Sequence, residues 1–349
     1  MQNELLSALR ATAVLYGALA VLTACSTMSS SRLQRFEFSR VEMALPFRIV
    51  LYAPSRMAAS NAVEAAFARI HYLNDVLSDY DSDSELSRLS QTSGTGREVP
   101  VSEDLWRVLS RAQEIATSSG GAFDITVGPL VNIWRNARRV KRLPEPELLE
   151  EARTRVGYTN LVLNAKKRSA RLLVPGMRID VGGIGKGYAL DEALKVLVAH
   201  GTPRALVTGG GDMAAGERPP RKNGWRIEIA ALDVTNTPPV RFVLLHQAGL
   251  ATSGDLFQRL EIEGKRYSHI VDPRTGLGLT DHSLVTIIAK NATSADGLSK
   301  VVSVLGPEKA FRIVEGEGAA AHVVRKPGEK IESYETRSFA AFYDTAGIP

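Results

Sequence analysis

The sequence predicts a single α+β domain with mixed or antiparallel sheets and packed helices, and three observations support this fold class. The chain has 349 residues, of which 44% are hydrophobic and 23% charged, an ordinary globular composition that can bury a core. Helical and strand-like segments alternate without the regular βαβ order of a doubly wound sheet. After residue 35 there is no repeat, low-complexity tract or obvious linker. We therefore expect one domain over residues 36–349.

The first 24 residues have the pattern of an export signal. Arg10 precedes an apolar run, residues 13–22, that is short for a membrane span but suits the apolar part of a signal peptide. The run leads through Thr and Ala to Cys25, the only cysteine in the chain, and this pattern resembles a bacterial lipobox. We expect Cys25 to anchor a lipoprotein on the periplasmic side of a bacterial membrane, inner or outer, with residues 25–35 as a polar tether. An ordinary export signal with an incidental cysteine is the alternative.

The first half of the domain contains one predicted strand and two predicted helices. Residues 47–53, FRIVLYA, read as a strand. Ser60 can cap a helix, and a second helix runs from Ser102 to the glycine pair at 120–121. The apolar faces of the two helices are Val63, Phe67, Ile70 and Leu77, and Leu105, Val108, Leu109, Ala112 and Ile115. The basic run at 135–142 lacks interleaved aromatic residues, and we interpret it as a solvated surface segment.

The second half of the domain is rich in strands. A helix over residues 188–200 ends at a glycine, and a helix over 293–305 is closed by Gly-Pro. The predicted strands are 205–212, 225–232, 240–246, 282–290 and, after a further helix, 320–326. The formal net charge of +5 is mild and does not suggest a nucleic-acid-binding protein.

A glycine-rich loop, RIDVGGIGKGYALD over residues 178–191, lies between a strand-like run and a helix. Its spacing does not match the dinucleotide-binding fingerprint, and no Ser or Thr follows Lys186 as in a Walker loop. A glycine loop that opens a helix still offers N–H groups and the positive end of the helix dipole. Lys186 adds a cation, and Asp180 adds an acceptor. The loop suits a polar anionic ligand, with a simple glycine-rich turn as the alternative.

Eight separated segments form an ordered set. They are EMALPFRIVLYA, SDYDSDSELSRLS, GGAFDITVGPLVNIW, RIDVGGIGKGYALDEAL, ALVTGGGDMAAGE, ATSGDLFQ, RYSHIVDPRTG and TSADGLSKVV. In this order and at these distances they resemble the ApbE family, the FAD:protein FMN transferases. No single motif is specific, whereas the ordered set is, and it covers nearly the whole chain after residue 40.

The resemblance implies an enzyme that binds FAD and, with Mg²⁺, transfers its FMN part to a Thr or Ser hydroxyl of an acceptor protein. AMP leaves, and a phosphoester joins the flavin to the acceptor. The acceptor is typically a flavoprotein subunit of a membrane electron-transfer system. An FAD diphosphatase that gives FMN and AMP, and a non-catalytic FAD-binding lipoprotein, are the alternatives.

The resemblance also implies site residues. His269 and Asp296 are the candidate catalytic residues, and the Gly183 carbonyl and Asp296 are the candidate metal ligands. The candidate FAD-binding residues are Met43, Tyr80, Ala122, Phe123, Asp124, Asp180, Lys186, Ser253, His269 and Ile270.

Two of these candidates have a structural alternative. His269 would deprotonate or orient the acceptor hydroxyl, or it would instead hydrogen-bond the Asp272 turn and shape the pocket. The segment from Thr252 through Ser253 to Asp255 would form a polar pocket edge, or else a simple strand-ending turn.

One position departs from the family pattern. Relatives usually carry a Thr four residues after the Asp that corresponds to Asp296, and both ligate Mg²⁺; here that residue is Lys300, which has no lone pair when protonated. Ser299 is expected to point about 100° away around the helix and to be a poor substitute.

Three interpretations follow. Asp296 and Lys300 form an i,i+4 pair, which contributes about 0.2–0.5 kcal/mol. Alternatively, the Lys300 ammonium partly replaces the charge of the ion. Or the metal binds more weakly, through Asp296, the Gly183 carbonyl, waters and FAD phosphate. We favour weakened or altered use of Mg²⁺. Two smaller departures are Thr208, where relatives commonly have Asn, and Ala-Leu after Met43 in place of Gly-Thr.

Overall fold

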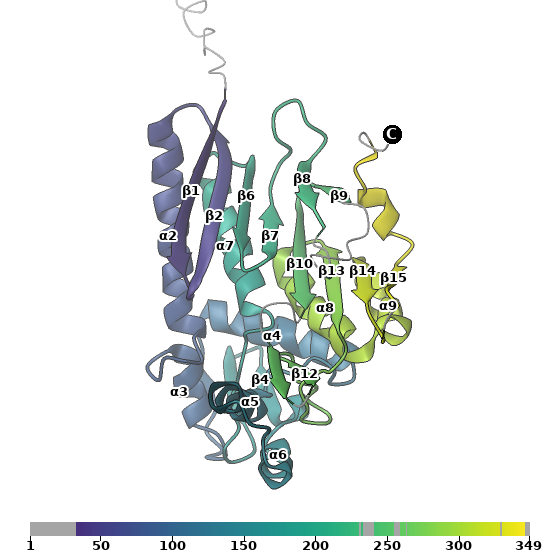
Figure 1. Ribbon diagram of the computed structural model, residues 1–349. Coiled ribbons are helices and arrows are strands. Elements are labelled where there is room, and N and C mark those ends of the chain that lie inside the picture. The colour runs from purple at the N-terminus through teal and green to yellow at the C-terminus, as the bar shows by residue number, and fades with distance from the viewer. Residues whose placement is uncertain are drawn as a thin grey trace, which may run out of the picture.

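The computed structural model describes residues 33–229, 232, 241–254, 259–262, 264–328 and 330–345 (Figure 1). The expected signal peptide, Cys25, Asp255 and most of the expected tether lie outside the described residues. Among the described helices, none has the length and apolar character that crossing a membrane requires.

A large antiparallel sheet organises the protein. It has eight strands in the order β1-β2-β6-β7-β10-β13-β14-β15, and each neighbouring pair is antiparallel. The strands are β1 (Gln34–Glu42), β2 (Leu45–Ala53), β6 (Ala205–Gly209), β7 (Asp212–Ala215), β10 (Ala248–Gly254), β13 (Ser283–Ala289), β14 (Ala320–Arg325) and β15 (Glu332–Glu335). The predicted α+β class with antiparallel sheets is therefore confirmed.

Both faces of this sheet are covered. Successive side chains of a strand point to opposite faces, so neighbouring residues belong to different hydrophobic clusters. Ile49 and Val207 face the main core with α2 (Arg56–Leu77), α7 (Gly185–Ala199) and α8 (Ala292–Leu305). Val50 and Leu206 face a second cluster, which the hairpin of β8 (Trp225–Glu228) and β9 (Phe242–Leu245) and the 3₁₀ helix η2 (Phe339–Phe342) help to form. The helices α4 (Glu103–Ser118) and α9 (Pro307–Gly316) pack beside α8.

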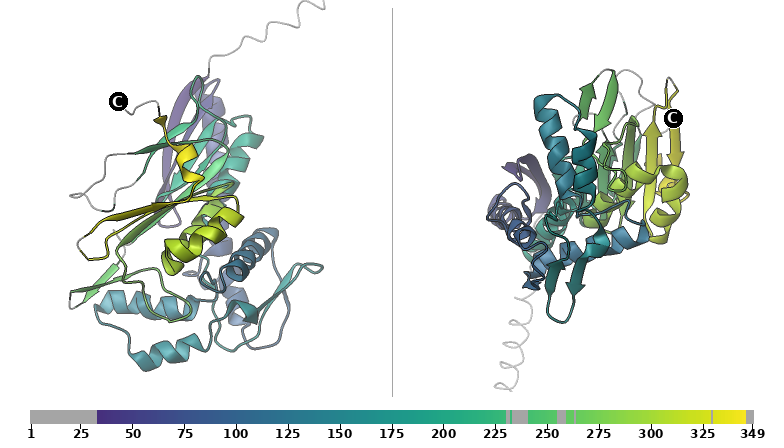
Figure 2. Two further views of the ribbon diagram at one scale, coloured as in Figure 1. Left: turned by 90° about the vertical axis from the view of Figure 1, so that its right-hand side faces the viewer. Right: turned by 90° about the horizontal axis from the view of Figure 1, so that it is seen from below.

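The remaining elements form a smaller layer at one end of the molecule. They are α3 (Glu85–Gln91), α5 (Gly128–Val140), α6 (Pro146–Arg153), the 3₁₀ helix η1 (Tyr158–Asn160), the sheet of β3 (Val99–Pro100), β5 (Ser169–Leu172) and β4 (Leu161–Asn164), and the hairpin of β11 (Arg259–Ile262) and β12 (Lys265–Ser268). Figures 1 and 2 show α5 and α6 at the end opposite to the point where the described chain begins.

One expectation about the elements is wrong, and another holds only in part. The helix α2 starts five residues earlier than expected: Ser55, not Ser60, is its N-cap, and the Ser55 hydroxyl accepts a hydrogen bond from the Ala58 amide. The basic run at 135–142 is exposed over most of its length, as expected, but its first part belongs to α5, where Ala137 is buried and Arg135 is partly buried. In addition, β1 begins at Gln34, two residues before the expected start of the domain.

Candidate active site

Close packing explains Gly187, in the first turn of α7. A Cβ atom on Gly187 would lie 2.3 Å from the carbonyl oxygen of Ala292 and 2.9 Å from Cβ of Asp296, so glycine lets α7 and α8 meet here. The Gly187 amide donates a 3.1 Å hydrogen bond to Oδ2 of Asp296. The loop therefore sets the contact between the two helices that carry the candidate site.

Lys186 lies in the first turn of α7 and extends toward the turn between β6 and β7. Its Nζ lies 3.0 Å from Oδ2 of Asp212 and 3.4 Å from Oδ2 of Asp296. Gly210, in this turn, has φ of +60°, and a Cβ atom there would lie 3.5 Å from Cδ of Lys186, an ordinary contact distance. Asp212 was not among the residues expected at the site, because a lone Asp after three glycines carries no distinguishing signal in the sequence.

Lys300 occupies the other side of the same carboxylate. Its Nζ lies 2.6 Å from Oδ1 of Asp296 and donates hydrogen bonds to the hydroxyls of Ser253, at 2.9 Å, and Ser299, at 3.2 Å. The Asp296 side chain is fully buried and that of Lys300 is 15% exposed. The expected i,i+4 pair is thus present, but it lies inside the protein, where such pairs matter far more than on a helix surface.

The expectation that Ser299 points away from the site is wrong. Its hydroxyl donates to the carbonyl of Asp296 at 2.6 Å and lies 2.7 Å from the Ser253 hydroxyl. The rotation of about 100° around the helix turns Ser299 toward β10. Because α8 packs directly on β10, this strand supplies Ser253 at that position.

Burial and neighbouring charges set the pKa values in this cluster. Burial raises the pKa of Asp296, but the ammonium groups of Lys186 and Lys300 outweigh it and hold the pKa below its ordinary value. Burial lowers the pKa of Lys186, whereas the carboxylates of Asp212 and Asp296 reverse this and raise it. For Asp212 the effect of burial is larger than that of the nearby Lys186 ammonium, so the pKa of Asp212 is raised. Two lysines therefore surround a firmly ionised Asp296.

A second polar cluster lies at the N-terminal part of the glycine loop, around Asp180. Arg135 of α5 pairs with Asp79 and, at 3.0 Å, with Oδ2 of Asp180, while Oδ1 of Asp180 accepts a 2.8 Å hydrogen bond from the Gly182 amide. Burial and the nearby Asp79 raise the pKa of Asp180, and Arg135 opposes them. The Arg135 guanidinium also stacks 4.2 Å from the ring centre of Tyr80, which is 79% exposed.

The segment at 122–124 lines the loop from another side. A Cβ atom on Gly183 would lie 3.3 Å from the ring of Phe123 and 3.4 Å from Cγ of Lys300, so Gly183 lies between these two side chains. Ala122 is buried. The carboxylate of Asp124 accepts two 2.7 Å hydrogen bonds from Thr126, and burial raises its pKa. Both of these bonds go to Oδ1, and the backbone of Tyr158 also hydrogen-bonds the Asp124 carboxylate.

The other candidates come from two loops. Met43 and Ala44 form the turn between β1 and β2, both at positive φ, and the next residue, Leu45, lies beside Gly210. The turn therefore lies next to Lys186. Its two residues are not glycines, although a positive φ favours glycine.

His269 and Ile270 follow β12 directly. His269 is partly exposed and Ile270 is buried, and the Ile270 amide donates to the Ser268 hydroxyl at 3.1 Å. The Asp272 carboxylate is held by Arg274, with hydrogen bonds of 2.8 and 2.9 Å. The turn after His269 is therefore stabilised by its own arginine.

The donor atoms present do not fit a divalent cation in this arrangement. Oδ1 of Asp296 is bonded to Lys300, and Oδ2 to the Gly187 amide, with Lys186 also close. A metal here would replace one of these partners and would sit against an ammonium group. Within the described parts of the chain, no group of three His, Cys, Asp or Glu side chains is arranged to hold a metal ion.

The fold and the site together define a class: an α+β protein in which a glycine loop, a helix N-terminus and a buried lysine–carboxylate cluster meet, as recognition of an anionic ligand requires. The model of the ApbE family matches residues 43–323. The chain belongs to the ApbE family.

Individual relatives agree with this assignment. The chain is 32% identical over 276 residues to the FAD:protein FMN transferase of Haemophilus influenzae, covering 77% of this chain and 79% of that one. It is 33% identical over 273 residues to that of Klebsiella pneumoniae, covering 76% and 77%. The crystal structure of Pseudomonas stutzeri flavinyl transferase ApbE, apo form, superimposes with a TM-score of 0.79 at 29% identity, covering 90% of this chain and 99% of that one.

Proposed function

We propose that the chain is an FAD:protein FMN transferase. It binds FAD, cleaves the pyrophosphate and attaches FMN through a phosphoester to a Thr or Ser hydroxyl of an acceptor flavoprotein, releasing AMP. The observation that carries this proposal is the cluster of Lys186, Asp296 and Lys300 at the glycine loop, in a chain that matches the family over residues 43–323.

The chemistry needs positive charge at this position. The acceptor oxygen attacks the phosphorus of the FMN part, the bond to the bridging oxygen breaks, and AMP leaves with the negative charge that this bond releases. Cations and oriented N–H groups stabilise that charge. Lys186, Lys300 and the first turn of α7 supply them, and His269 is the proposed acceptor of the hydroxyl proton.

The flavin end of the ligand needs apolar and aromatic walls. Phe123 lies against Gly183, and Tyr80 is exposed above Arg135, so both rings border the glycine loop. We assign the isoalloxazine ring to this side, with Met43, Ala122 and Ile270 as further walls. Asp180 is then positioned by Arg135 and the Gly182 amide before the ligand binds.

The resemblance leads us to expect Mg²⁺, whereas each oxygen of Asp296 already has a partner, the Lys300 ammonium on one and the Gly187 amide on the other. The proposed transfer therefore depends on the lysines and the N–H groups of the site and not on the ion.

The proposed location is the periplasmic side of a bacterial membrane, with a lipid anchor on Cys25. The support is the apolar run at 13–22 followed by the only cysteine of the chain. The proposed acceptor is a flavoprotein subunit of a membrane electron-transfer system, which an anchored enzyme would meet at the same surface.

Lys300 favours a second candidate, a non-catalytic FAD-binding protein, because a lysine replaces an expected metal ligand.

One experiment separates the candidates: the purified protein is incubated with FAD, with and without Mg²⁺ and an acceptor flavoprotein, and products are followed by mass spectrometry. The transferase yields acceptor carrying one FMN, together with AMP. FMN and AMP without acceptor indicate a diphosphatase, and tight FAD binding without products contradicts the transferase.

A further inference from the structure

We propose that the Lys300 ammonium takes the place of a divalent cation in this chain, so that the site binds FAD and works without a metal. This inference rests on the proposed function for its catalytic part only. Its binding part concerns the protein and FAD alone and is tested separately.

The position of the ammonium is that of a cation among oxygens. Lys300 Nζ has three oxygen partners: a carboxylate oxygen of Asp296 and the hydroxyls of Ser253 and Ser299. Its carbon chain passes Gly183, since a Cβ atom there would lie 3.4 and 3.6 Å from Cγ and Cε. Carboxylate and hydroxyl oxygens are the ligands that a hard cation prefers, and here they surround a charge that belongs to the protein.

The ammonium can still act on a phosphate. Its bond to Ser299 is the longest of the three, at 3.2 Å, and Ser299 has other partners in Ser253 and the Asp296 carbonyl. A phosphate oxygen can replace this bond without leaving a buried hydroxyl unpaired. The two bonds that remain, to Asp296 and Ser253, would keep the ammonium in place.

A metal cannot enter beside it by a small movement of Asp296. The other carboxylate oxygen is held by the Gly187 amide, and Gly187 packs against Ala292 with no space for a methyl group. Asp296 is thus fixed between α7 and α8. A divalent cation would have to remove the lysine side chain or lie next to its like charge, which is unfavourable inside a protein.

The first test measures binding. Titration of the wild-type protein with Mn²⁺, followed by electron paramagnetic resonance, should show no stoichiometric binding, and FAD affinity should be equal with EDTA and with Mg²⁺. Lys300→Thr removes the ammonium and adds a hydroxyl, so it should bind Mn²⁺ and need a divalent cation for tight FAD binding. Lys290→Thr, at an exposed lysine outside the cluster, is the matched control and should behave as wild type. Stoichiometric Mn²⁺ binding by the wild type would overturn the proposal.

The second test measures turnover. Wild-type transfer should continue in EDTA, whereas Lys300→Met should lower kcat/KM by about a hundred-fold, the usual effect of losing one fixed stabilising group. Mg²⁺ should restore Lys300→Thr and not Lys300→Met. If no FMN is transferred under any condition while the binding results hold, the proposed function fails and the assignment of Lys300 stands. If EDTA abolishes wild-type transfer, the assignment fails and the function stands.

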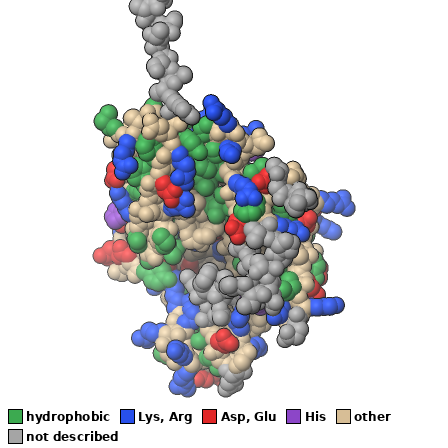
Figure 3. All heavy atoms as spheres, turned by 45° about the horizontal axis from the view of Figure 1, so that its top comes forward, with side chains coloured by type: hydrophobic (Ala, Val, Ile, Leu, Met, Phe, Trp, Pro, Cys, Tyr) green, Lys and Arg blue, Asp and Glu red, His purple; other side chains and the backbone are tan. Residues whose placement is uncertain are grey.

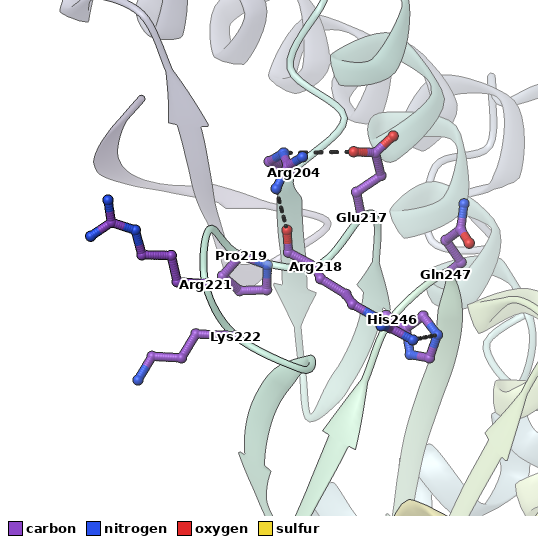
Figure 4. A pocket seen from close by; sticks show the side chains of 8 residues that line it. All are labelled: Arg204, Glu217, Arg218, Pro219, Arg221, Lys222, His246 and Gln247. Carbon is purple, nitrogen blue, oxygen red and sulfur yellow. Dashed lines mark hydrogen bonds and ion pairs between the residues drawn. The ribbon is translucent and has the colours of Figure 1, made fainter. Parts of the chain in front are cut away.

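A separate observation carries a second inference, at the other end of the hairpin formed by β6 and β7. A hollow of about 490 Å³ lies there (Figure 4). Its wall includes Arg204, Arg218, Arg221 and Lys222, with Glu217 as the acidic member. Glu217 pairs with Arg204 at 3.6 Å, and Arg218 hydrogen-bonds His246 at 2.9 Å. Arg221 and Lys222 project outward, away from this network (Figure 4).

This hollow lies next to the place where the described chain begins. Gln34 pairs with Ala53 across β1 and β2, and the neighbouring Tyr52 amide donates to the carbonyl of Arg204 at 2.9 Å. Figure 3, which brings this end forward, shows Lys and Arg side chains around it. A fully extended chain from Cys25 to Gln34 spans at most about 32 Å. A lipid on Cys25 would hold this end close to the membrane.

We infer that the basic hollow docks on the anionic phospholipid headgroups of the membrane that holds the anchor. Clustered Arg and Lys side chains are attracted to such a surface within about a Debye length. The site at Lys186 would then face away from the lipid, since Asp212 and the hollow lie at opposite ends of β7.

Hydrogen exchange of the acylated full-length chain tests this inference. The protein is placed in nanodiscs of phosphatidylcholine with or without phosphatidylglycerol. Residues 217–224 should exchange more slowly in the anionic discs, and high salt or Arg221→Glu with Lys222→Glu should remove this protection. Lys166→Glu with Lys309→Glu makes the same change in charge at exposed positions elsewhere and should keep it. Equal exchange in both kinds of disc would overturn the inference.

Discussion

Lys186 and Lys300 both approach one buried carboxylate, that of Asp296, although they come from different helices. Lys300 Nζ lies 2.6 Å from Oδ1, and Lys186 Nζ lies 3.4 Å from each of the two oxygens. Through these contacts the glycine loop, which carries Lys186, is joined to α8, and two positive charges are held at the site.

Removing this carboxylate should unfold the protein more easily. Asp296→Asn leaves Lys300 buried without its counter-charge, and losing one partner of a buried pair costs about 3–5 kcal/mol. We expect a loss of about 3 kcal/mol in the free energy of unfolding, measured by urea denaturation, together with loss of transfer. Asp75→Asn, at an exposed position of α2, should change stability by no more than about 0.5 kcal/mol. Equal stability of Asp296→Asn and wild type would contradict the account of the cluster.

The contact between α7 and α8 should not tolerate a methyl group. Gly187→Ala places a Cβ atom 2.3 Å from the Ala292 carbonyl oxygen and should destabilise the protein by about 1–3 kcal/mol, as overpacking does. The amide bond to Asp296 would weaken as the helices separate, so transfer should fall too. Gly185→Ala, whose nearest neighbour would be 3.4 Å away, is the matched control in the same helix and should be tolerated. The unfolding temperatures of both variants test this prediction. If Gly187→Ala is no less stable than Gly185→Ala, the steric argument is refuted.

Arg135 should matter both for stability and for FAD. Arg135→Met leaves Asp180 buried without its cation and removes the contact with Tyr80, so we expect a loss of about 2–3 kcal/mol, below the range for fully buried pairs because Arg135 is 23% exposed. FAD affinity, followed by flavin fluorescence, should fall in parallel. Arg139→Met changes an exposed arginine of the same helix and provides the comparison. Unchanged FAD affinity in Arg135→Met would remove this cluster from the site.

Stability should fall as the pH drops through the titration of His322. Burial lowers the pKa of His322 below its ordinary 6.5, and Arg241 adds to this effect. Below pH 6.5 the unfolded chain therefore binds a proton that the folded chain resists, so the free energy of unfolding decreases as the pH falls. His322→Gln keeps a polar partner for Ser333 and removes the titration. Below pH 6.5 the wild type should therefore lose stability relative to His322→Gln. A difference that does not change with pH would show that the pKa of His322 is the same in the folded and unfolded chains.

The sequence predicted the features that depend on local patterns. The glycine loop, the helices after it and the strands of the second half follow from periodicity and turn residues, and the structure has them within a few residues. Arg135 could not be found in this way. It lies in a run of basic residues that looks solvated, and its partners, Asp79 and Asp180, are far away in the sequence.

Ser299 shows the same limit on a smaller scale. Helical spacing placed Ser299 about 100° around the helix from Lys300 and so predicted, wrongly, that it points away from the site. Only the fold shows that β10 lies in that direction and presents Ser253. Lys300 is the opposite case, because the departure from the family pattern was visible in the sequence. The structure added the partners of its ammonium group.

The contact at Gly187 has a consequence for the barrier of the reaction. Because α7 and α8 touch there, the charges of the site are fixed by the two helices and not by a mobile loop. The polar groups are oriented before the ligand arrives, and they need little reorganisation when negative charge develops on the phosphate. Preorganisation of this kind is where fixed charges lower a barrier most.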